Sequence, residues 1–183
     1  LVFENLPSSF TNGAKDPHAR EEMHNASCMA GMAFANAFLG LNHSMAHKLG
    51  AFHHLPHGLA NAVILTRVMR YNAAEAPVKM GTFSQYSYPH ALERYCECAR
   101  FVGVTGANDE EVFENFITKI EALKERVGIR KTIRDYGVEE SVFLETLDDM
   151  CEQAFDDQCT GANPRYPLIS EIREMYLTAY YGA

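Results

Sequence analysis

The chain has 183 residues, of which 47% are apolar and 22% are charged, values ordinary for one globular domain with a buried core. This composition excludes disordered and fibrous classes of protein. Sixteen Lys and Arg against 24 Asp and Glu give a formal net charge of -8, and the basic residues are scattered along the chain. We therefore expect neither nucleic acid nor an anionic membrane as a partner.

Cysteine use favours a reducing compartment. The five cysteines are an odd number and include no C-x-x-C pair, so they indicate neither a disulfide framework nor a zinc ribbon. A cytoplasmic location fits best. They are Cys28, Cys96, Cys98, Cys151 and Cys159.

The first forty residues predict two helices. The segment 1–7 has the pattern of the last turn of a helix that Pro7 ends, and the missing start methionine and basic leader suggest a fragment of a longer protein. Asp16 and Pro17 then open a long helix that ends near Gly40. From His24 onward this helix has apolar residues on every side, which predicts that other helices surround it and that Cys28 lies in the core. Its longest apolar run, 29–41, is shorter than the roughly 20 residues that span a bilayer.

Two further helices are predicted before residue 77. One carries His43 and His47, and the next begins at the break 56–58 and continues through Met69. The segment 77–88 has the composition of an irregular loop.

The second half of the chain continues as helices. One helix is expected at 89–102, another begins after a capping pattern formed by Asn108 and Glu111, and the last is expected at 167–180. A polar, turn-rich segment lies at 156–165. Two apolar stripes recur at spacings of three and four. They comprise Phe113, Phe116, Ile117, Ile120 and Leu123, and Val142, Phe143, Leu147 and Met150. No strand-type alternation competes, so the sequence predicts a single all-α helical bundle over 1–183.

The segment 43–57 contains five of the chain's eight histidines. Residues four apart lie on one face of a helix, so His43 and His47 can direct two imidazoles to one point, with His57 arriving from the next helix. Neutral imidazole suits zinc and iron. The glycines Gly50 and Gly58 and the proline before His57 allow close backbone approach and favour this interpretation.

The alternative is that these histidines are ordinary surface and core residues, since a pair spaced by four occurs by chance in many helices. His53 and His54 point in different directions, so at most one of them can join a site. A catalytic metal has at least three protein ligands, and no carboxylate lies near the cluster in the sequence. A carboxylate would come from a distant segment, such as Asp156 or Asp157, or from outside this chain.

Two segments carry a resemblance to a known family. Residues 31–50, GMAFANAFLGLNHSMAHKLG, and 55–62, LPHGLANA, resemble the iron-containing alcohol dehydrogenases. Residues 155–169 and the final YYG resemble the alcohol dehydrogenase part of the bifunctional aldehyde-alcohol dehydrogenases. The resemblance covers essentially the whole chain and implies the C-terminal helical domain of a dehydroquinate synthase-like, iron alcohol dehydrogenase fold.

The resemblance also implies a different ligand set from the spacing argument. Its metal ligands are an Asp and a His on an earlier helix, which match nothing in this chain, and two histidines that match His43 and His57. The resemblance implies that His47 lies near the nicotinamide and either handles protons or shapes the active site, without binding the metal. The nucleotide-binding domain that precedes the helical domain in this family is absent from the sequence, so no cofactor-binding residue is identified.

For the complete enzyme, the resemblance implies interconversion of a short aldehyde, such as acetaldehyde, and its alcohol with NADH and NAD. Iron, or zinc, is the expected metal, and a homo-oligomer is the expected assembly. We place Phe52 and Cys159 as candidates in the substrate cleft, with a helix-capping loop as the alternative role of the segment that contains Cys159. Alone, the fragment is expected to be inactive; the other hypothesis is a non-catalytic helical module that supplies subunit contacts.

Overall fold

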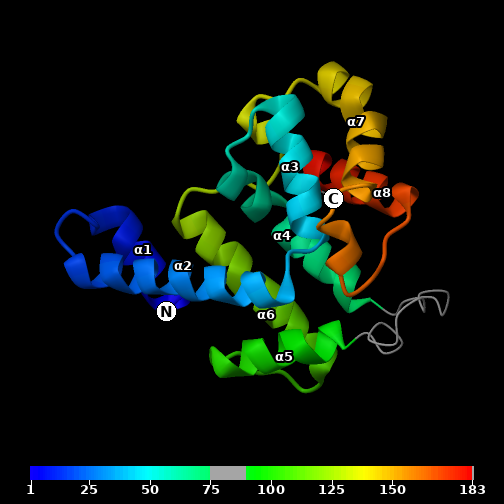
Figure 1. Ribbon diagram of the computed structural model, residues 1–183. Coiled ribbons are helices and arrows are strands. Elements are labelled where there is room, and N and C mark those ends of the chain that lie inside the picture. The colour runs from blue at the N-terminus through cyan, green and yellow to red at the C-terminus, as the bar shows by residue number, and fades with distance from the viewer. Residues whose placement is uncertain (75–89, 183) are drawn as a thin grey trace.

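The computed structural model describes residues 1–74 and 90–182. Within these residues every regular element is a helix and no strand is present, which confirms the all-α prediction. The helices gather around two hydrophobic cores, and the first two helices extend to one side (Figure 1). The predicted loop at 77–88 lies outside the described residues.

The main core is built by four helices from both halves of the chain. They are α3 (Leu41–His53), α4 (His57–Ala73), α7 (Glu140–Phe155) and α8 (Ile169–Tyr181). Each contributes fully buried apolar side chains, as expected for amphipathic helices packed face to face. The largest of these are Leu41, Met45, Leu49, Val63, Ile64, Phe143, Leu147, Met150, Ile172, Tyr176 and Tyr180.

A second, smaller core lies between α4, α5 (Ala91–Phe101) and α6 (Asp109–Arg126). The stripe predicted for α6 is confirmed at Phe113, Phe116, Ile117 and Ile120, all of which are buried. The predicted cap of α6 is also present, since the Asn108 side chain accepts a hydrogen bond from the Glu111 N–H at 2.9 Å. Glu111 itself accepts from the Ala107 N–H at 2.7 Å, one residue before the position that a capping box uses.

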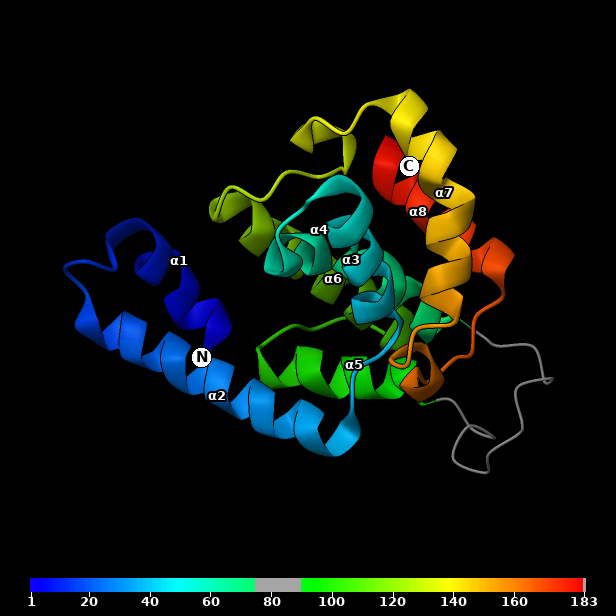
Figure 2. The same ribbon diagram turned by 45° about the horizontal axis from the view of Figure 1, so that its top comes forward.

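The first two helices, α1 (Val2–Asn12) and α2 (Pro17–Ala37), pair with each other and project from the rest of the molecule (Figure 2). Asp16 caps α2 as predicted by accepting from the Ala19 N–H at 3.0 Å. Its end at Ala37 is close to the predicted one. A groove of about 1000 Å³ lies between this pair and α5 and α6, with Phe3, Met29 and Phe101 among its lining residues. Beside the groove α1 contacts α6, since the ring centroids of Phe3 and Phe116 are 6.2 Å apart.

The prediction that other helices surround α2 is wrong for the described structure. Ala19 is its one buried residue, while Met29 and Met32 are 57% and 58% exposed. Cys28, expected in the core, is exposed as well. The apolar residues are present on every side, but α1 covers one side and the groove and solvent face the others. None of the described helices is long and apolar enough to cross a membrane.

Two smaller expectations also fail. Pro7 does not end a helix, because α1 continues through it to Asn12. A proline inside a helix removes the hydrogen bond of its own nitrogen and crowds the carbonyl four residues earlier, and α1 forms despite this cost. Val142 was expected in the apolar stripe of α7, but it is 45% exposed. Phe143 is fully buried, and Val142, about 100° around the helix from it, lies at the exposed edge of the apolar face.

Candidate active site

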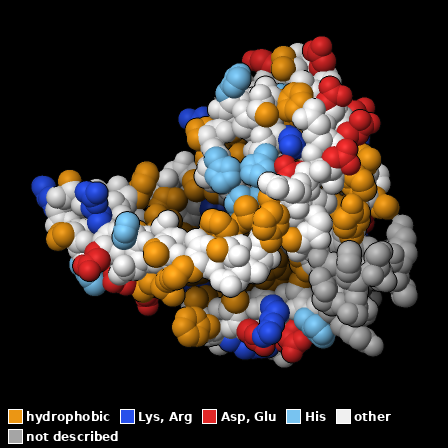
Figure 3. Space-filling view, in the orientation of Figure 1, with side chains coloured by type: hydrophobic (Ala, Val, Ile, Leu, Met, Phe, Trp, Pro, Cys, Tyr) orange, Lys and Arg blue, Asp and Glu red, His pale blue; other side chains and the backbone are white. Residues whose placement is uncertain are grey.

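The histidine cluster is formed by α3 and the start of α4. His43 and His47 lie one turn apart on α3, and their ring centroids are 6.1 Å apart. The centroid of His57 is 5.3 Å from that of His43 and 5.7 Å from that of His47. Figure 3 shows histidine side chains gathered at this surface. The structure therefore brings together the three imidazoles that the sequence singled out.

The turn between the two helices places His57 beside α3. His54 ends α3 in the left-handed conformation with a φ of 58°, and its N–H donates to the Gly50 carbonyl at 3.1 Å. Pro56 precedes the first residue of α4, where proline restricts the backbone to an extended conformation. The chain thus reverses within three residues and brings His57 back toward His43.

An asparagine pair contacts the ring of His57. The Asn42 side-chain amide donates to Asn61 Oδ1 at 2.8 Å, so the Nδ2 group of Asn61 is the one that faces His57 Nε2, at 3.2 Å. Because this Nδ2 group can only donate, the Nε2 atom of His57 must accept and carries a lone pair. The lone pair of Nε2 faces Asn61 in this geometry, so a metal ion bound at this nitrogen would replace the Asn61 contact.

His43 is also held neutral. Burial and then the neighbouring imidazoles of His57 and His47 lower the pKa of His43 below its ordinary value. A neutral imidazole is the form that binds a metal ion. The donor set of His43 and His57 therefore fits a divalent metal such as iron or zinc, although two imidazoles fall short of the three protein ligands that catalytic metals have.

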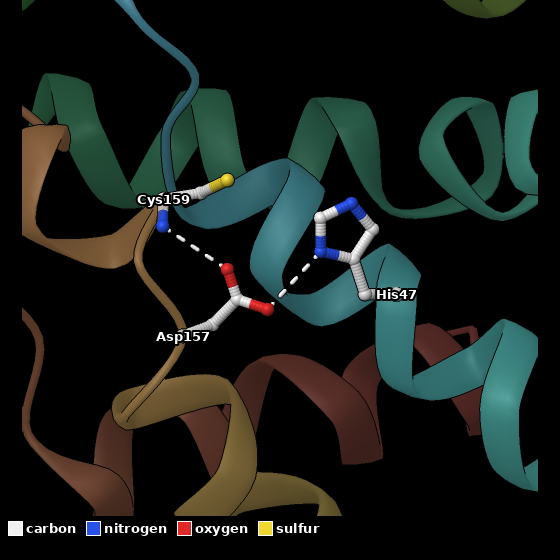
Figure 4. Close-up of side chains that lie close together, drawn as sticks. All are labelled: His47, Asp157 and Cys159. Carbon is white, nitrogen blue, oxygen red and sulfur yellow. Dashed lines mark hydrogen bonds and ion pairs between the residues drawn. The ribbon is translucent and has the colours of Figure 1, made fainter.

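A carboxylate reaches the cluster from the far end of the sequence. Asp157, two residues after the end of α7, lies with its Oδ2 3.1 Å from His47 Nδ1 (Figure 4). The same oxygen is 3.1 Å from the Lys48 Nζ, and Oδ1 accepts from the Cys159 N–H at 3.0 Å. Burial raises the pKa of Asp157, but the hydrogen bonds from Cys159, His47 and Lys48 outweigh it and hold that pKa well below its usual range.

Asp157 contacts His47, and Cys159 adjoins both. Cys159 is 2% exposed, and burial, followed by its hydrogen bond to Asp157, raises the pKa of its thiol to about 11. Potential ligand atoms of His47, Asp157 and Cys159 lie within 4.8 Å of one another, the one such group found among residues 1–74 and 90–182. The Lys48 ammonium is paired with the carboxylate of Asp157, and its positive charge would repel a metal cation at this group. We interpret the group as a hydrogen-bonded cluster.

The remaining histidines do not join the site. His53 lies with its Nε2 3.1 Å from the hydroxyl of Thr146 on α7, and His54 serves as the cap of α3. Neither of the two adjacent histidines therefore belongs to the cluster. Phe52 is half-buried and packs against the main core, so its place in a substrate cleft stays a prediction.

Comparison with known proteins identifies the family. Residues 1–180 match the C-terminal part of the Fe-containing alcohol dehydrogenase family. The chain belongs to the iron-containing alcohol dehydrogenases. It is 52% identical over 184 residues to the bifunctional aldehyde-alcohol dehydrogenase of Escherichia coli K12, covering 100% of this chain and 21% of that protein. The aldehyde-alcohol dehydrogenase of Clostridium acetobutylicum is 48% identical, covering 98% and 21% of the two proteins.

Solved structures of iron-containing alcohol dehydrogenases have the same helical fold. A 1,3-propanediol oxidoreductase matches with a TM-score of 0.81 at 34% identity, covering 98% of this chain and 42% of that one. The enzyme of Thermococcus thioreducens matches with a TM-score of 0.81 at 35% identity, covering 100% and 42%. The resemblance found in the sequence is confirmed for the family, the fold and the bifunctional group. The chain spans about a fifth of the length of the curated relatives named above.

Proposed function

We propose that this chain supplies part of the metal and substrate site of an NAD-dependent, iron-containing alcohol dehydrogenase that interconverts a short aldehyde and its alcohol. The observation that carries the proposal is the meeting of His43, His47 and His57 at one surface of α3 and α4. The aldehyde-alcohol dehydrogenases among its relatives support acetaldehyde and ethanol as the substrate pair.

We assign His43 and His57 as metal ligands. The lowered pKa of His43 favours the neutral imidazole that binds metals, and iron(II) is the proposed metal, with zinc as the alternative. When bound, a divalent metal supplies Lewis-acid chemistry that polarises a carbonyl oxygen. Because two imidazoles are an incomplete ligand set, further ligands must come from residues outside this chain, and we propose that the chain alone does not turn over alcohol.

His47 is proposed to handle the proton that the hydroxyl group of the alcohol loses and regains. Its imidazole lies beside the two proposed ligands and is 34% exposed, so a substrate can reach it. A general acid–base group must lie within hydrogen-bond reach of the proton that it moves. Cys159 and Phe52 are retained as candidates for the wall of the cleft.

A second candidate function is that of a helical assembly module. Its support is the exposed apolar surface of α2, where Met29, Met32 and Phe34 are about half exposed. Exposed apolar patches of this kind mark contact surfaces. Under this alternative the chain contributes subunit contacts to a homo-oligomer and the histidine cluster has no part in catalysis.

A chimeric enzyme separates the two functions. In the E. coli relative, the matching segment of 184 residues is replaced by this chain, and NAD-dependent ethanol oxidation is measured together with bound iron. We expect an active chimera whose activity and bound iron fall by about tenfold or more with His57→Ala, because a metal ligand is lost.

The matched control is His24→Ala, which removes an exposed histidine of α2 that lies outside the cluster. It should leave both ethanol oxidation and iron content unchanged. An active chimera that loses neither activity nor iron on His57→Ala contradicts the proposed metal site and leaves the assembly function as the better one.

A further inference from the structure

We propose that Asp157 is a positioning residue that fixes the tautomer of His47, so that the bare Nε2 of this imidazole faces the open side of the site. This inference rests on the proposed function, since it assigns the group that prepares His47 for proton transfer. Asp157 is separated from His47 by 110 residues, and the fold brings their side chains to 3.1 Å.

The first step is the chemistry of the hydrogen bond. An ionised carboxylate can only accept hydrogen bonds, so the Nδ1 atom of His47 must carry the proton in its contact with Asp157 Oδ2. A neutral imidazole has one N–H, and Nε2 is therefore bare. The Lys48 ammonium pairs with the same oxygen and compensates the charge of the carboxylate.

The second step is that Asp157 is held rigidly. Its Oδ1 accepts from the Cys159 N–H at 3.0 Å, which fixes the side chain within the turn after α7. The side chain of Asp157 is 9% exposed, whereas that of His47 is 34% exposed. The covered carboxylate thus holds one nitrogen of the ring, and the other nitrogen lies on the side away from it (Figure 4).

The third step is the consequence for proton transfer. During oxidation of an alcohol, the bare Nε2 would take the hydroxyl proton, and a nicotinamide, when bound, would supply the acceptor for the hydride on the carbon. The imidazolium formed is stabilised by Asp157, and it returns the proton during reduction of the aldehyde. With the opposite tautomer Nε2 would already carry a hydrogen and could not accept this proton.

The test reads the tautomer directly in this chain. The ¹⁵N shifts of the imidazole nitrogens are measured by long-range ¹H–¹⁵N correlation at about pH 8.5, roughly two units above the ordinary pKa of histidine. The signals of His47 are assigned by their loss in His47→Gln. We expect Nδ1 at the shift of a protonated nitrogen and Nε2 at that of a bare one. An Nε2-protonated His47 in the unaltered chain overturns the inference without any Asp157 variant.

The variant Asp157→Leu removes the acceptor at similar side-chain size. We expect the His47 signals to change to those of a mixture of tautomers, as in a free imidazole. Asp156→Leu is the matched control, because Asp156 is the exposed neighbouring carboxylate, and it should leave the His47 signals in place. A single Nδ1–H tautomer that persists in folded Asp157→Leu also overturns the inference.

Activity in the chimeric enzyme gives an independent readout. Asp157→Leu should lower kcat for ethanol oxidation by about tenfold or more with little change in KM, since general acid–base catalysis contributes roughly 10²–10⁴. Asp156→Leu should change neither. Full kcat in Asp157→Leu overturns the positioning role while the proposed function stands. An inactive parent chimera counts against the proposed function, and the tautomer measured in this chain still decides the role of Asp157.

Discussion

Tyr176 joins the helix that carries the histidines to the last helix of the chain. Its hydroxyl is buried and donates to the Met45 carbonyl at 2.8 Å, and Met45 lies between His43 and His47 on α3. The ring adds to the main core, and the hydroxyl joins α8 to the backbone of α3. One side chain therefore contributes both to stability and to the placement of the site.

Removing this hydroxyl tests its contribution. Tyr176→Phe keeps the buried ring and loses one hydrogen bond, so we expect the free energy of unfolding to fall by about 0.5–1.5 kcal/mol, measured by urea denaturation. The control is Tyr181→Phe, whose hydroxyl bonds Glu140 at 2.9 Å on the exposed surface and should matter by less than about 0.5 kcal/mol. Equal effects of the two variants would contradict the role of the buried bond.

The packing of the helix α7 determines where Asp157 lies in the site. The helix packs against α3 through buried side chains that include Phe143 and Leu147, and it ends at Phe155, two residues before Asp157. The packing of α7 therefore sets the position from which Asp157 reaches His47. Loosening this helix should affect both stability and the carboxylate contact.

Two leucines of α7 allow its buried face to be compared with its exposed face. Leu147 is fully buried and Leu144, one turn earlier, is 44% exposed. We expect Leu147→Ala to lower the free energy of unfolding by about 2–5 kcal/mol, because it removes a buried side chain and leaves a cavity. Leu144→Ala should cost far less, and both values come from chemical denaturation of the same chain. A comparable loss in the two variants would mean that α7 is not packed as described.

Local patterns in the sequence predicted the elements better than their surroundings. The cap at Asn108 and the spacing of Phe113 and Phe116 depend on neighbouring residues, and both were confirmed. Burial of α2 depends on which helices pack beside it, and its composition alone cannot specify them. The prediction that Pro7 ends a helix failed for a related reason. The residue type alone does not show whether the rest of a helix outweighs the cost of a proline inside it.

The same distinction holds for the site. The approach of His43 to His47 follows from helical spacing, and the turn at Pro56 brings in His57. The contact between His47 and Asp157 has no local pattern, because it depends on how α7 docks against α3. The sequence named Asp157 only as one of two distant carboxylates, and its actual partners, His47 and Lys48, emerged from the fold.

At the scale of the whole molecule, stability should be unequal between the packed helices and the projecting pair. The main core buries residues of α3, α4, α7 and α8 on one another. In contrast, α2 has 21 residues and one buried side chain, and a groove of about 1000 Å³ separates part of it from α5 and α6. Segments with few buried apolar contacts open at a lower free energy than the core.

Hydrogen exchange of this chain measures that difference. We expect amides of α2 at 26–37 to exchange about 100-fold faster than those of α7 at 143–154, because α2 can open without disturbing either core. The control is α6, which has 18 residues, similar to α2, but buries its apolar face and should exchange slowly. A 100-fold ratio corresponds to about 2.7 kcal/mol of opening free energy. Protection of α2 equal to that of α6 and α7 would show instead that the projecting pair opens only when the whole chain unfolds.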